Sequence, residues 1–108
     1  MSSNHLVVLA TARAQVGQED ELKSRLEGVA KASWEEPGVV KYAVHDLAVK
    51  PGEFIMGEVY ASREAFDAHL ETKHVKRLIA DLGDLVDREL VVHQGTTASF
   101  SAGPKGAL

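Results

Sequence analysis

The chain repeats one pattern: an apolar strand, an amphipathic helix and a second strand, within about 45 residues each time. Apolar alternation, turn residues and capping residues predict strands and helices in a fixed order: strand 5–14, helix 18–34, strand 39–49, strand 54–61, a helix capped by Ser62, a short helix capped by Thr72, and strand 85–93. This β-α-β-β-α-β order is typical of the split βαβ plan. The sequence therefore predicts a ferredoxin-like α+β fold, with one antiparallel sheet and helices on one face.

The predicted strands place specific side chains on shared faces, because alternate residues of a strand point the same way. In strand 39–49, one face carries Val40, Tyr42 and Val44. In strand 54–61, one face carries four residues: Phe54, Met56, Glu58 and Tyr60. Glu58 is thus expected to be a partly buried carboxylate that needs hydrogen-bond donors.

The first two strands are apolar on both faces, although helices are expected on only one. In strand 5–14, Leu6 and Val8 alternate with Val7 and Leu9. An open apolar sheet face on a small protein usually marks a partner surface. We therefore expect a homodimer in which two sheets face each other.

Composition excludes several classes of protein. The net charge is −4 and no basic run occurs, so nucleic-acid binding is not expected. The absence of cysteine removes disulfides and thiolate chemistry, and it fits a cytoplasmic protein. No apolar run approaches the roughly 20 residues of a membrane span. The 108 residues suit one domain at 5–93, with an extension at 1–4 and a tail at 94–108.

The stretch FDAHLETKH contains two histidines, His69 and His74, five positions apart. In one unbroken helix, a five-residue step rotates the side chain by ~140°, whereas a zinc-binding helix uses a four-residue step. The spacing therefore predicts no metal site. His69 is expected to face inward because Phe66 and Leu70 flank it, while His74 is expected to be exposed or to cap a helix.

Two runs, EEPGVVKY and FIMGEVYASREAFDAHLETKHV, resemble the antibiotic biosynthesis monooxygenase domain. The shared patterns are E-x-G-x-x-x-Y, E-x-[WY] and A-[FL]-x-x-H-x-x-[ST]-x-H, and the resemblance covers about residues 5 to 93. It implies a dimeric α+β barrel with a ligand pocket between sheet and helices. The activities it implies are diverse: cofactor-free oxygenation of anthrones and quinols by O₂, haem degradation, and isomerisation of a small phosphorylated signal.

The haem-degrading branch of that family uses an asparagine, a tryptophan and a histidine. The matching positions here hold Ala10, Tyr60 and a residue near Leu78. The resemblance therefore implies no haem, and no other cofactor is expected.

The sequence thus favours a cofactor-free monooxygenase acting on a small hydrophobic or aromatic substrate with O₂. His69 is the expected base, because an imidazole pKa of about 6.5 suits proton transfer at neutral pH. Tyr60 is the expected hydrogen-bond partner of the developing oxyanion, and Glu58 is a further acid–base candidate. The expected substrate-binding residues are Trp34, Tyr42, Met56, Phe66 and His74.

Other interpretations remain open at this stage. Each candidate side chain can instead be structural, as a hydrogen-bonded core group or a packing residue. The protein could be a non-catalytic dimer that binds a small ligand. It could also be an isomerase of a small polar metabolite, for which Lys73, Lys76 and Arg77 would supply charge.

Overall fold

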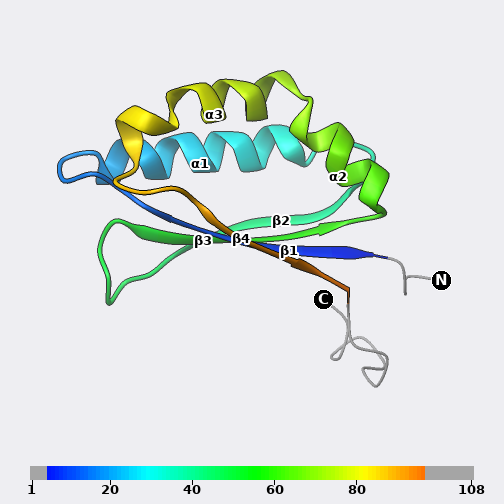
Figure 1. The fold of residues 1–108 in the computed structure, drawn as a ribbon, viewed down its shortest axis with the longest axis horizontal. Coiled ribbons are helices and arrows are strands. Elements are labelled where there is room, and N and C mark those ends of the chain that lie inside the picture. Colours follow the sequence, from blue (N-terminus) through cyan, green and yellow to red (C-terminus); the bar gives the residue numbers. More distant parts are fainter. Residues whose placement is uncertain (1–4, 97–108) are drawn as a thin grey trace.

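A computed structural model of the chain describes residues 5–96 (Figure 1). Its elements are β1 (Leu6–Arg13), α1 (Glu19–Ser33), β2 (Val39–Asp46), β3 (Glu53–Tyr60), α2 (Arg63–Leu70), α3 (Lys73–Leu85) and β4 (Val91–Gly95). The predicted order is confirmed, with the second helical region divided into α2 and α3 as the two capping residues indicate. Within the described range, no helix is long and apolar enough to cross a membrane.

The four strands form one antiparallel sheet in the order β2-β3-β1-β4, and the three helices lie on one side of it (Figure 1). This is the predicted ferredoxin-like α+β architecture. β1 and β3 form the centre of the sheet, and their inner faces meet α1 and α3. The core lies between these two layers.

Strict alternation along the central strands builds the sheet side of the core. Leu6, Val8, Ala10 and Ala12 of β1 are buried, and so are the four residues predicted to share a face of β3. Leu22 and Leu26 of α1 are fully buried against them. Each such leucine stabilises the fold by roughly 1.5–3 kcal/mol relative to an exposed one.

The start of β2 corrects the predicted face of that strand. A β-bulge lies there, because Val39 pairs with Tyr60 while Lys41 already pairs with Val59. The extra residue turns Val39 towards the core and leaves Val40 44 % exposed. Grouping Val40 with Tyr42 was therefore wrong, whereas Tyr42 and Val44 do face inward.

The last strand begins later than the sequence pattern indicated. Leu85 still belongs to α3, and Val86 makes only an isolated bridge to Ala14. β4 pairs with β1 from Val91 to Gly95, so it includes the first residues of the stretch predicted as a tail. The predicted extension at 1–4 and the stretch 97–108 lie outside the described residues.

Within residues 5–96, no helix covers the outer face of the sheet, as Figure 1 shows. Its apolar residues include Leu9, which is 42 % exposed, and Val91 on the neighbouring strand. Leu9 lies between the buried residues Val8 and Ala10 and so points to the opposite face. Val91 pairs with Thr11, which shares that face with Leu9. One sheet thus has a core face and an open, partly apolar face.

Candidate active site

The break between α2 and α3 decides where the two histidines point. Thr72 has extended backbone angles, and its hydroxyl accepts a hydrogen bond from the Val75 amide at 3.4 Å, which caps α3. Because the helix is interrupted here, the ~140° separation of an unbroken helix does not apply. His69 and His74 instead point to the same side chain, and the expectation that they face apart was wrong.

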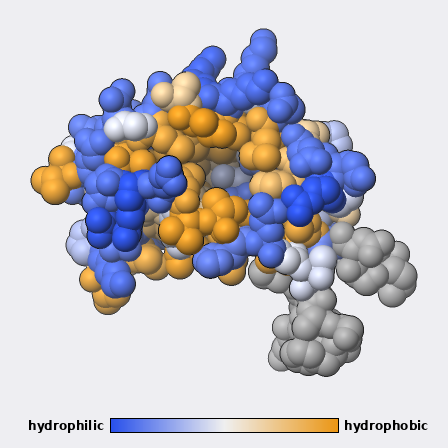
Figure 2. Space-filling model, viewed as in Figure 1, coloured by the Kyte–Doolittle hydropathy of each residue, from blue (hydrophilic) through white to orange (hydrophobic). Residues whose placement is uncertain are grey.

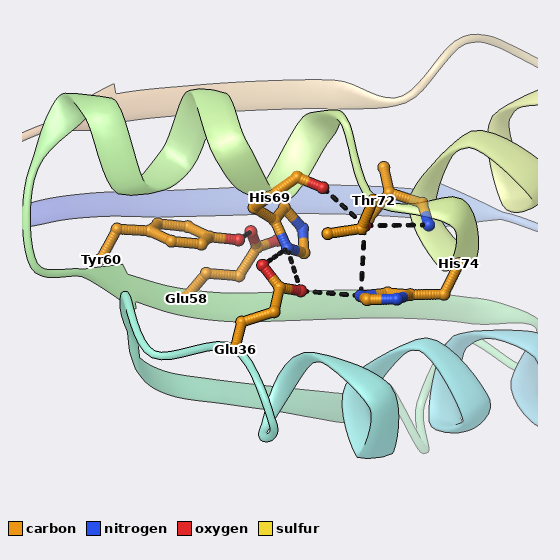
Figure 3. A network of polar contacts seen from close by, with 7 residues as sticks. Glu36, Glu58, Tyr60, His69, Thr72 and His74 are labelled. Carbon is orange, nitrogen blue, oxygen red and sulfur yellow. Dashed lines mark hydrogen bonds and ion pairs between the residues drawn. The ribbon is translucent and has the colours of Figure 1, made fainter.

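That shared side chain is Glu36, in the loop between α1 and β2 (Figure 3). Nδ1 of His69 lies 3.0 Å and Nε2 of His74 lies 2.7 Å from the same carboxylate oxygen, Oε2. The loop before β2, the last turn of α2 and the first turn of α3 therefore meet at one carboxylate. Glu36 is the glutamate of the E-x-G-x-x-x-Y pattern, but it was not among the predicted site residues.

Gly38 explains why this loop can approach α2 so closely. A Cβ atom at position 38 would lie 2.5 Å from the Cβ of Ala65, too close for any side chain. The Gly38 carbonyl also accepts a hydrogen bond from the Ala61 amide at 2.9 Å. The glycine of the E-x-G pattern thus allows the glutamate two residues earlier to reach His69.

The Glu36 contact fixes the tautomer of His69. A carboxylate oxygen accepts hydrogen bonds, so Nδ1 carries the proton and donates it to Glu36, which leaves Nε2 with a free lone pair. Nε2 has no hydrogen-bond partner among residues 5–96. Burial lowers the pKa of His69, while the Glu36 carboxylate raises it in part. Because the net shift is downward, the ring is neutral and can accept a proton at neutral pH.

A cavity of about 170 Å³ lies between the sheet and the helices; His69 lines it, whereas Glu36 and His74 do not. Figure 2 shows a hollow surrounded by apolar side chains on this face of the molecule. Fifteen residues line the cavity, and nearly all are apolar: Val8, Ala10, Val29, Tyr42, Met56, Glu58, Phe66, His69, Leu70, Val75, Leu78, Ile79, Leu82, Leu90 and Val92. Its polar groups are supplied by Tyr42, Glu58 and His69.

Glu58 and Tyr60 form a second polar pair beside the cavity. The Tyr60 hydroxyl donates a hydrogen bond of 2.5 Å to Oε1 of Glu58, and both residues are buried. Burial raises the pKa of Glu58 to about 7, although the tyrosine hydrogen bond opposes this shift. Burial and the nearby Glu58 charge raise the pKa of Tyr60, so its hydroxyl keeps its proton.

Aromatic rings surround His69. Its ring centroid lies 5.1 Å from Tyr60, 5.6 Å from Tyr42 and 6.3 Å from Phe66. These rings exclude water from the imidazole and leave the residue only 3 % exposed. The expectation that His69 faces inward is confirmed.

The structure brings together most of the predicted site residues, but not all of them. Five line the cavity: Tyr42, Met56, Glu58, Phe66 and His69. Three predicted site residues lie outside the lining. Tyr60 is hydrogen-bonded to Glu58, and His74 is hydrogen-bonded to Glu36. Trp34 is 59 % exposed, and its indole N–H donates to the Tyr42 carbonyl at 2.8 Å.

Glu36, His69 and His74 are also a set of groups that could hold a metal ion, because their ligand atoms all lie within 4.8 Å of one another. Two imidazoles and one carboxylate are a donor set that zinc and non-haem iron accept. The sequence excluded a metal here from the five-residue spacing alone, and that reason fails once the helix breaks.

Comparison with known proteins agrees with this architecture. The crystal structure of PA3566 from Pseudomonas aeruginosa has a TM-score of 0.85 at 23% identity and covers 92% of this chain and 99% of its own. Rv0793 from Mycobacterium tuberculosis has a TM-score of 0.83 at 24% identity, with coverages of 89% and 97%. Identities this low establish a shared fold only.

The sequence profile of the antibiotic biosynthesis monooxygenase family matches residues 5–81. No curated protein matches the chain. The profile covers the chain from β1 to most of α3, including Glu36, His69 and His74, whereas three residues of the cavity lining lie beyond it: Leu82, Leu90 and Val92. The chain therefore belongs to the antibiotic biosynthesis monooxygenase family.

Proposed function

We propose that the protein is a cofactor-independent monooxygenase that oxidises a small quinol- or anthrone-like aromatic molecule with O₂. The observation that carries the proposal is the orientation of His69. Its Nδ1 is held by Glu36, and its ring forms part of the wall of an apolar cavity. A neutral imidazole with a free Nε2 beside such a cavity is suited to remove a proton from a bound substrate. The family match supports the same class of chemistry.

The proposed reaction starts when Nε2 of His69 takes a proton from an acidic C–H group of the substrate. The electron-rich anion transfers one electron to O₂, and the radical pair combines to form a carbon-bound peroxide. His69 returns its proton to give the hydroperoxide. Loss of the second proton from the same carbon breaks the O–O bond and yields a carbonyl group and one molecule of water. The substrate carbon supplies all four electrons that reduce the two atoms of O₂, as its CH₂ group becomes a carbonyl group, so no cofactor is required.

Glu58 is the proposed donor to the oxyanion that develops in the cavity. With a pKa of about 7, its carboxyl group is protonated in a large share of molecules at neutral pH and can donate a hydrogen bond. Tyr60, which the sequence suggested for this role, holds Glu58 in place instead, since its hydroxyl is committed to that carboxyl group. The hydrogen bond thereby positions the donor.

The cavity favours a small, uncharged aromatic substrate. Its volume of about 170 Å³ is below the usual range for drug-sized ligands. Lys73, Lys76 and Arg77 are exposed and do not line it, so the cavity lining formed by residues 5–96 contains no lysine or arginine to bind a phosphate group. This arrangement argues against the phosphorylated-metabolite isomerase and leaves a non-catalytic ligand-binding protein as the alternative.

We also propose that the functional unit is a homodimer formed through the open face of the sheet, with residues such as Leu9 at the contact. Burying these side chains removes apolar surface from water. Light scattering should give twice the chain mass of 11.7 kDa, and a monomer at micromolar concentration would refute it. A cytoplasmic location remains a prediction from the absence of cysteine.

Oxygen uptake with a panel of quinols and anthrones, measured with a metal chelator present, tests the proposed function. We expect turnover by the wild type and a loss of roughly 10²–10⁴-fold in His69→Gln, the usual size of a general-base contribution. Circular dichroism and melting temperature on the same samples show whether the variant is folded. A folded His69→Gln protein with full turnover would contradict the proposal. Ligand binding without oxygen uptake would favour the binding protein.

A further inference from the structure

We infer that Glu36, His69 and His74 form a binding site for a divalent transition metal such as Zn²⁺, and that the ion switches off the base by occupying Nδ1 of His69. The inhibitory part of this inference rests on the proposed function. The binding part stands on geometry alone.

The distances between the three side chains suit a single ion. Zinc lies about 2.0–2.2 Å from imidazole nitrogen and carboxylate oxygen, so neighbouring ligand atoms of a tetrahedral site are roughly 3.3–3.6 Å apart. The two nitrogen–oxygen distances, 3.0 Å and 2.7 Å, are slightly shorter than this, and all the ligand atoms lie within 4.8 Å of one another. Small shifts of the three side chains would therefore place both nitrogens and the carboxylate around one ion.

The supporting contacts hold the donors in place. The Thr72 hydroxyl donates to the His69 carbonyl at 2.7 Å and lies 3.2 Å from Nε2 of His74. This hydroxyl therefore links the end of α2 to the start of α3 beside the imidazole rings of His69 and His74 (Figure 3). His74 is partly exposed, which gives an ion a route from solvent.

The position of the site decides what the ion would do. Glu36 and His74 do not line the cavity, so the ion would lie on the side of His69 away from a bound substrate. An ion there would not contact the substrate or its O₂. A neutral imidazole whose Nδ1 binds metal carries its one proton on Nε2, where it can no longer accept another. Metal binding and base function are thus mutually exclusive at this residue.

The binding test is titration of chelator-treated protein with Zn²⁺ by calorimetry, and with Co²⁺ by visible absorption. The wild type should bind one ion. His74→Gln removes one of three ligands and should weaken binding by more than the roughly 10–100-fold that loss of a supporting group costs. His93→Gln is the matched control, because His93 is an exposed histidine of β4 outside this cluster.

The inhibition test adds Zn²⁺ to the oxygen-uptake assay. Zn²⁺ should abolish turnover by the wild type and His93→Gln, and turnover by His74→Gln should resist it. Equal Zn²⁺ binding by the wild type and His74→Gln, or binding that leaves wild-type turnover intact, would overturn the inference. A protein that binds one ion through these residues but never consumes O₂ would retain the site and refute the proposed function instead.

Discussion

Two polar clusters flank the cavity, and they differ in how the chain builds them. Glu58 and Tyr60 are two residues apart on one strand, and the pleat alone puts them on one face. The carboxylate of Glu36 is 33 residues from His69 and 38 from His74, and three elements must meet to join them. The first cluster depends on local geometry, whereas the second depends on a loop, a helix break and a glycine.

The electrostatic contrast follows from the partners available in each cluster. The Glu58 carboxylate has one hydroxyl donor, so burial dominates and its pKa rises to about 7. The Glu36 carboxylate has two imidazole N–H donors instead. Glu58 can therefore hold a proton at neutral pH, whereas Glu36 can orient His69 as a base.

The largest effect is expected from Glu36→Gln. The amide can donate an N–H group to Nδ1 of His69 and so favour the tautomer whose Nε2 already carries a proton. We expect turnover to fall by roughly 10²-fold or more with little loss of stability. Oxygen uptake checks this, and unchanged turnover in the folded variant would show that the carboxylate does not orient the base.

Replacing Glu58 by glutamine should change the free energy of unfolding with a defined pH dependence, because the amide can still donate a hydrogen bond but cannot ionise. Its folded-state pKa of about 7 lies above the ordinary value of 4.5, so the folded state binds more protons between these values and stability falls as pH rises through the interval. Glu58→Gln should remove this loss. It should therefore be more stable than the wild type at pH 8 by roughly 3 kcal/mol, with no such advantage at pH 4. Urea denaturation at both pH values measures the difference, and equal stability at pH 8 would contradict the raised pKa.

Gly38→Ala tests whether close packing of the loop on α2 builds the second cluster. The added methyl group would collide with Ala65, at a cost of about 1–3 kcal/mol for overpacking. The free energy of unfolding should fall by this amount, while Gly28→Ala, where an added Cβ meets no neighbour, serves as the control. A stable Gly38→Ala protein with full turnover would mean that the loop before β2 does not need to pack this closely against α2.

The smallest effect is expected from Trp34→Phe, because Trp34 belongs to neither cluster and does not line the cavity. The variant loses one hydrogen bond to a backbone carbonyl, worth about 0.5–1.5 kcal/mol. Its turnover should match that of the wild type in the oxygen-uptake assay. A large rise in KM would place the indole in substrate binding, as the sequence suggested.

The same contrast explains how far the sequence could predict the structure. Period-two alternation was sufficient to place Met56, Glu58 and Tyr60 on one inner face, and helical spacing placed Phe66 and His69 there too. Alternation failed at Val40, because a bulge adds a residue that no pattern reveals. The sheet order and the start of β4 also depend on pairings between distant segments.

The functional cluster was only partly predictable for the same reason. Thr72 was recognised as a capping residue, yet the direction of His74 after the break depends on where α3 packs. The E-x-G pattern contained the missing signal, since it holds both Glu36 and the glycine that lets the loop reach α2. A pattern of letters does not show which element such a loop approaches.

The most direct test of the account separates proton removal from oxygen chemistry. Without O₂ and with a chelator present, the protein should accelerate exchange of the acidic C–H protons of anthrone with D₂O, followed by NMR. Folded His69→Gln should lose this exchange by roughly 10²-fold or more, the scale of general-base catalysis. If folded His69→Gln catalyses the exchange as fast as the wild type, His69 is not the base and the proposed mechanism is wrong.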